Sequence, residues 1–153
     1  MVMTKKKKAA ILQRFQDTYG ILKPALHYAS DFELLVAVVL SAQCTDERVN
    51  IVTAELFPEY NSPEKMLQLG LQGLEEKIRT CGLYHSKAKN LMATCAVLCE
   101  NHKGEVPRTF DELVKLPGVG RKTANVLVSV LFDTPAIAVD THVFRVSNRL
   151  QLA

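Results

Sequence analysis

The sequence predicts an all-α fold of about eight to ten short helices. Apolar residues recur at helical spacing along most of the chain, and no segment alternates apolar and polar residues as a half-buried strand would. With 153 residues, 48% of them hydrophobic and 23% charged, the chain can bury a core and is too mixed in composition to be disordered. Helices are expected over residues 5–19, 30–40, 46–57, 62–70, 74–80, 86–104, 109–116, 121–132 and 141–150.

Local signals justify the first three helices. The first carries apolar residues on one stripe and ends at Gly20, which suits a helix terminus. Ser30 and Glu33 form a capping box, and the residues that follow are apolar nearly all round through Leu40. That run predicts a helix sunk in the core, although its β-branched residues leave a buried strand possible. Thr45 is the expected cap of the third helix.

The middle of the chain carries equally clear signals for the starts and ends of helices. Ser62–Glu64 places a cap, a proline and an early acid at the start of a short helix that Gly70 stops. Another helix ends at Gly82, and Ser86 is expected to open a longer one that ends at Gly104.

Three signals place the C-terminal helices. Thr109 and Glu112 make a second capping box. Pro135 forces an extended link after the helix over 121–132. Asp140 then caps the final helix.

A tight turn is predicted inside the stretch LPGVGRKTA, residues 116–124. Pro117 fixes φ for the second position of a type II turn, and Gly118 supplies the positive φ that the next position requires. Gly120 then lets the backbone approach a ligand closely where a helix begins. Exposed N–H groups at the positive end of a helix dipole favour an anion, although a solvated corner between two helices would look similar.

Two cations follow the turn, in a place that the helix dipole disfavours. Arg121 and Lys122 stand on the first helical turn, which indicates a negative partner nearby. About 18 Å of helix and an extended link of up to about 23 Å allow Asp140 to return beside Lys122. An amine is nucleophilic only when neutral, and the helix N-terminus with the adjacent Arg121 favours loss of its proton. Lys122 as a simple phosphate contact and Asp140 as a plain helix cap remain alternatives.

Charge and cysteine content give weaker constraints. The net charge of +3 permits a polyanionic partner without requiring one, and the basic run Lys5–Lys8 is most simply a solvated end. No membrane span or secretory signal is recognisable, which predicts a cytoplasmic protein. The four cysteines form no CxxC pair, so reduced thiols are expected and no metal site is predicted; they are Cys44, Cys81, Cys95 and Cys99.

Several motifs together resemble the endonuclease III family of the helix-hairpin-helix DNA glycosylases. The resemblance extends from about residue 9 to the end. It implies a bifunctional base-excision repair enzyme that removes oxidised pyrimidines and cleaves abasic sites by β-elimination. The motifs are FELL at 32–35, SAQ at 41–43, TD at 45–46, GLY at 82–84, GEVP at 104–107, LPGVGRKTANV at 116–126 and AVDTHVFR at 138–145.

The resemblance also implies a domain plan. It predicts a six-helix barrel-like domain over residues 24–135, with the helix-hairpin-helix at about 110–132. A second helical domain would be assembled from both chain ends, residues 1–23 and 136–153. The expected partner is double-stranded DNA with an oxidised pyrimidine or an abasic site, bound by a monomer associated with the nucleoid.

Roles for individual residues follow from the same resemblance. Lys122 matches the catalytic lysine whose amine attacks C1′ and forms a Schiff base. Asp140 matches the catalytic aspartate, which assists the lysine or stabilises the cationic sugar. Adenine glycosylases of the superfamily keep the aspartate but lack this lysine and the Thr141-His142 pair, so the lyase branch is favoured. The positions that match DNA-binding residues are Gln43, Leu83, Gly118, Val119, Gly120 and Arg121.

In one respect the sequence departs from the family pattern. Full-length relatives continue to four closely spaced cysteines that hold a [4Fe-4S] cluster, and none of the four cysteines here matches those ligands. A fragment or truncated product is therefore expected, with Val143, Val146 and Leu150 of the last helix exposed. A catalytically inactive DNA-binding protein is the alternative function.

Overall fold

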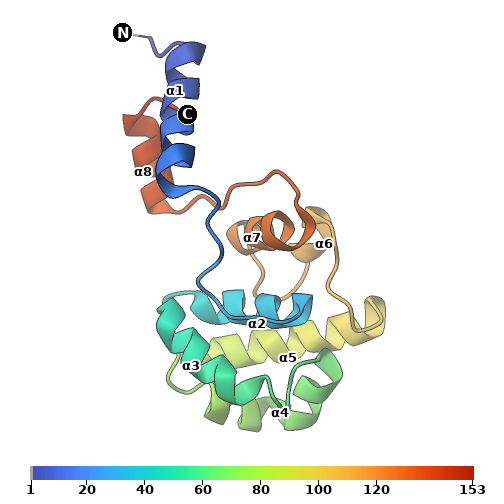
Figure 1. Ribbon diagram of the computed structural model, residues 1–153. Coiled ribbons are helices and arrows are strands. Elements are labelled where there is room, and N and C mark those ends of the chain that lie inside the picture. Colours follow the sequence, from blue (N-terminus) through green and yellow to red (C-terminus); the bar gives the residue numbers. More distant parts are fainter. Residues whose placement is uncertain (1) are drawn as a thin grey trace. The chain divides into compact units, whose positions relative to one another are not determined.

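The computed structural model describes residues 2–153, and its contacts divide the chain into two units. The larger unit is Ala25–Ala138, and the smaller one joins Val139–Ala153 to the residues up to Pro24. All regular structure in residues 2–153 is helical, which confirms the predicted fold class (Figure 1). The helices are α1 (Lys5–Tyr19), α2 (Asp31–Ser41), α3 (Asp46–Leu56), α4 (Pro63–Lys77), α5 (Tyr84–Asn101), α6 (Phe110–Leu113), α7 (Arg121–Phe132) and α8 (Thr141–Arg149).

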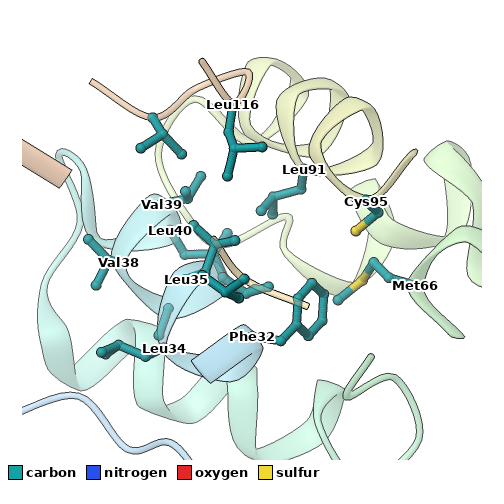
Figure 2. Packing of buried hydrophobic residues seen from close by; sticks show 14 of the residues in the cluster. Phe32, Leu34, Leu35, Val38, Val39, Leu40, Met66, Leu91, Cys95 and Leu116 are labelled. Carbon is teal, nitrogen blue, oxygen red and sulfur yellow. The ribbon is translucent and has the colours of Figure 1, made fainter. Parts of the chain in front are cut away.

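Helix α2 forms the centre of the larger unit. Every residue from Phe32 to Leu40 is buried, as the apolar run predicted, and the segment is a helix and not a strand. It packs against α3, α5 and α7, while α4 packs along α5 and α6 against α7. Figure 2 shows Leu35 and Leu40 of α2 meeting Leu91 of α5 and Leu116 of the turn before α7. The core therefore fixes where that turn lies.

Most predicted helix starts are confirmed by their caps. The Ser30 hydroxyl accepts the N–H of Glu33 at 3.2 Å, while the Glu33 carboxylate accepts from Ala29, one residue before the cap, at 2.7 Å. Thr45 likewise accepts the N–H of Arg48 at 3.2 Å. Local hydrogen bonds thus define these helix starts, as the sequence indicates.

Two details differ from the sequence prediction. The segments on either side of Gly70 form one assigned helix, α4, interrupted by a kink at Gly70, where φ is 79° and ψ is 166°. Helix α5 begins at Tyr84, two residues before the predicted Ser86, because Leu83 adopts a left-handed conformation that turns the chain directly into the helix. Ser86 therefore lies inside the first turn and is not a cap.

The smaller unit consists of α1 and α8 with their flanking residues. The Lys8 Nζ donates to the Leu152 carbonyl at 3.3 Å, which links the two ends of the chain. On α8, Val143 and Val146 are exposed as expected, whereas Leu150, the C-cap of α8, is half-buried. Among the described residues, no helix combines the length and apolar character needed to cross a bilayer.

Candidate functional site

The turn before α7 has the predicted type II geometry. The Val119 N–H donates to the Leu116 carbonyl at 3.1 Å, which closes the turn. Gly118 has φ of 76°, the positive value that the third position of this turn requires. The side chains of Leu116 and Val119 are buried, so the turn is anchored in the core while its backbone faces outward.

Helix α5 holds this turn in place. The Thr94 hydroxyl donates to the Pro117 carbonyl at 2.7 Å. A Cβ built on Gly118 would lie 2.8 Å from the Asn90 Cβ, closer than real Cβ contacts allow. Since Asn90 and Thr94 are one helical turn apart, α5 presses against the turn along a single face. Gly118 is therefore required for two reasons: a side chain there would clash with Asn90, and the backbone has a positive φ.

Not all of the predicted phosphate-binding amides are available. The Val119 N–H is used inside the turn, whereas within residues 2–153 the N–H groups of Gly118, Gly120 and Arg121 have no backbone acceptor. Gly120 is the N-cap of α7 and provides no capping side chain. Its φ is −88°, and a Cβ built there meets nothing within 4 Å. The first turn of α7 thus presents uncapped N–H groups to open space, which suits an anion.

Arg121 and Lys122 extend from this same first turn. The Arg121 guanidinium lies 5.4 Å from the centre of the Phe110 ring, a cation–π distance that directs it toward α6. Lys122 is exposed, and no ion pair with it occurs within residues 2–153. Lys122 is therefore exposed on the same first helical turn as the uncapped N–H groups, where a reactant can reach it.

Asp140 is the N-cap of α8, and its Oδ1 accepts the Val143 N–H at 2.7 Å. The side chain is partly buried. Lys122 belongs to the larger unit and Asp140 to the smaller one, so the pairing of the two remains a prediction.

The structure brings Gln43 and Leu83 to neighbouring turns. Both residues adopt left-handed conformations, with φ of 53° and 58°, and both are exposed. A Cβ built on Gly82 would lie 3.1 Å from the Gln43 carbonyl oxygen, so the two turns are in close contact. The thiols of Cys44 and Cys81, which flank these residues, also interact.

Sequence reasoning missed Lys87. This α5 lysine is 5% exposed, and its Nζ donates to the carbonyls of Leu40 and Ala42 at 2.8 and 2.5 Å. Its position could have signalled burial, because it lies four residues before Leu91 and seven before Thr94, on the stripe that faces the core.

All four cysteines are free thiols in the structure. Burial raises the pKa of the Cys81 thiol to about 11 and that of Cys95 to about 12, so both are thiols at neutral pH. In the part of the chain that the structure describes, no three His, Cys, Asp or Glu side chains are grouped so that they could hold a metal ion. The residues present do not fit the iron–sulfur cluster implied for longer relatives.

Comparison with known proteins defines the class to which this fold and turn belong. Residues 36–153 match the HhH-GPD superfamily of base excision DNA repair proteins. The chain belongs to this family.

Similar proteins include endonuclease III from two bacteria. Endonuclease III of Escherichia coli K12 is 52% identical over 151 residues, which cover 99% of this chain and 72% of that protein. Endonuclease III of Rickettsia conorii is 56% identical over 131 residues, which cover 86% of this chain. The matched segment spans 62% of the length of that relative.

The fold is also similar to a solved structure of a trapped covalent intermediate between endonuclease III and DNA, an estranged-adenine complex. The TM-score is 0.93 at 51% sequence identity, over 99% of this chain and 71% of the other.

Proposed function

We propose that this protein is a base-excision repair DNA glycosylase with an associated lyase activity toward abasic sites. The observation that carries the proposal is the exposed Lys122 amine, placed on the first turn of α7 directly after a turn with uncapped N–H groups. The sequence similarity to endonuclease III, and the covalent DNA intermediate known for that enzyme, support it.

The proposed reaction uses Lys122 as the nucleophile. Its neutral amine attacks C1′ of the damaged nucleotide, the N-glycosidic bond breaks, and the base leaves with the bonding electron pair. Loss of a proton from nitrogen and opening of the sugar ring give a Schiff base. Removal of a C2′ proton then breaks the bond between C3′ and its oxygen, which cleaves the strand.

The turn before α7 would place the DNA for this attack. A backbone phosphate accepts hydrogen bonds from the N–H groups of Gly118 and Gly120, with the α7 dipole and Arg121 adding positive potential. This assignment leaves out the Val119 amide, which donates to Leu116. Because the phosphate contacts fix the register of the strand, they set which sugar carbon Lys122 can reach.

Asp140 is assigned the second catalytic role, as proton acceptor or as stabiliser of the cationic sugar. The substrate would be duplex DNA with an oxidised pyrimidine or an abasic site, bound by a monomer. We also assign the barrel-like domain to residues 24–135, and residues 1–23 and 136–153 to a second, split domain. The protein would act on the DNA of the nucleoid.

Borohydride trapping tests the proposal. The chain is incubated with duplex DNA that holds one abasic site, in the presence of sodium borohydride, which reduces a Schiff base to a stable bond. We expect a covalent adduct with the wild-type chain and none with Lys122→Gln. Thymine glycol in place of the abasic site tests base removal as well, because an adduct then requires the glycosidic bond to break first.

Lys77→Gln is the matched control. Lys77 is an exposed lysine at the end of α4, so this variant loses the same charge without changing the turn or α7. It should form the adduct at the wild-type rate. If wild-type chain binds the abasic duplex without forming any adduct, a DNA-binding protein without lyase activity is the better description.

A further inference from the structure

Two exposed turns carry non-glycine residues in the left-handed conformation. Gln43 follows the end of α2, and Leu83 immediately precedes α5. Left-handed conformations are disfavoured for side chains such as these and persist where surrounding contacts hold them. The Gly82 backbone lies against the Gln43 carbonyl, so the two turns also touch. We therefore expect a nearby side chain to hold the two turns together.

Lys87 connects the two turns. Its backbone N–H donates to the Leu83 carbonyl at 3.0 Å. Its side chain donates to the carbonyls of Leu40 and Ala42, the second of which directly precedes Gln43. One residue thus forms hydrogen bonds within both turns.

The chemistry of this contact explains why a lysine stands there. Carbonyls at the C-terminus of a helix have no intrahelical partner and lie at the negative end of its dipole. An ammonium group with three donors satisfies two of them at once, and its buried charge is stabilised by that dipole. Within residues 2–153 no carboxylate forms an ion pair with Lys87, and its ammonium group donates instead to the Leu40 and Ala42 carbonyls.

We propose that Lys87 is a positioning residue for DNA insertion: it holds the Gln43 and Leu83 turns at a fixed separation, so that both side chains enter the duplex together when a nucleotide leaves the stack. This inference rests on the proposed function and on the family resemblance, which implies that Gln43 and Leu83 enter the duplex and fill the gap left by the flipped nucleotide. Lys87 acts through the turns and does not itself contact the DNA.

Substrate choice separates this role from general support of the fold. An abasic site in duplex DNA requires the insertion step, whereas an abasic site in single-stranded DNA does not. We expect Lys87→Met to lower the trapping rate on duplex DNA by about tenfold or more, and the rate on single-stranded DNA much less. In a Leu83→Ala background, the further loss from Lys87→Met should largely disappear, because the insertion step is already impaired.

A second variant reaches the same contact from the other side. Gly82→Ala places a Cβ 3.1 Å from the Gln43 carbonyl and pushes the turns apart without removing the ammonium. Gly82→Ala should show the same selective loss of trapping rate on duplex DNA. It provides the test of the positioning role if Lys87→Met does not fold. Lys89→Met removes an exposed lysine from the same helix and should behave as wild type on both substrates.

The outcomes distinguish this inference from the function on which it rests. If wild-type chain forms no adduct with either DNA, the proposed function fails. If wild-type chain forms both adducts, but Lys87→Met and Gly82→Ala reduce the two equally or not at all, the positioning role is overturned and the lyase activity stands.

Discussion

Substitution of Gly118 by alanine should be among the most damaging single changes in the turn before α7. Alanine at φ of 76° costs about 1 to 2 kcal/mol, because its Cβ approaches the adjacent carbonyl. The same Cβ would lie 2.8 Å from the Asn90 Cβ, which is too close to the α5 backbone to move aside freely. Overpacking of this kind costs about 1 to 3 kcal/mol. The free energy of unfolding should fall by about 2 to 5 kcal/mol in total.

Urea unfolding followed by circular dichroism measures this loss, and Gly120→Ala is its matched control. Gly120 has a negative φ and open space around the built Cβ, so alanine there should change stability little. Gly120→Ala does, however, add a methyl group next to the N–H that is assigned to a DNA phosphate. We therefore expect Gly120→Ala to weaken binding of an abasic duplex, measured by fluorescence anisotropy, without loss of stability.

A double variant separates the two costs at Gly118. Asn90→Gly removes the Cβ contact but leaves the backbone conformation unchanged, so Gly118→Ala should cost less in the Asn90→Gly background. The remaining cost reports the left-handed conformation. The reasoning is refuted if Gly118→Ala is as stable as wild type, or if Gly120→Ala destabilises the chain equally.

Asp140 and the buried thiols give two further predictions. Asp140→Ala should lower the free energy of unfolding by about 1 kcal/mol through loss of the α8 cap, whereas Asp140→Asn retains the cap; both should slow thymine-glycol release in a glycosylase assay. A wild-type rate in Asp140→Asn would exclude a role for the carboxylate charge. The pKa of Cys95 rises from 9.0 to about 12 in the folded chain, so its thiol loses the proton at a lower pH in the unfolded chain than in the folded one. The contribution of this thiol to the stability of the fold is complete below pH 9.0 and is lost as pH rises toward 12. The free energy of unfolding, obtained from urea titrations, should therefore fall as pH rises above 9.0, by on the order of 1 kcal/mol per pH unit, and an equal slope in Cys95→Ala would contradict this cause.

Those parts of the fold that depend on neighbours in sequence could be predicted. The type II turn follows from Pro117 and Gly118, whose allowed φ values suit its two central positions. Thr45 and Asp140 start helices because their side-chain oxygens reach an N–H three residues later. The burial of α2 follows from a run of residues with no polar face.

Contacts between distant residues could not be predicted in the same way. Nothing near Lys87 in the sequence reveals the carbonyls of Leu40 and Ala42, which are more than 40 residues away and become its partners only when α2 and α5 pack. The early start of α5 depends on a left-handed Leu83, a conformation that a leucine rarely adopts. The Val119 N–H could be assigned either to a phosphate or to the turn until the turn geometry was known.

The division of the smaller unit between the two ends of the chain has a consequence for synthesis. Lys8 hydrogen-bonds with Leu152, 144 residues later, whereas Ala25–Ala138 is continuous. At ribosomal speeds of about 5 to 20 residues per second, α1 emerges roughly 7 to 30 seconds before the segment that it contacts. A helix of 15 residues is marginal on its own in water, so α1 completes its fold only after the segment that it contacts has been made. Its run of four lysines keeps it hydrated during that interval.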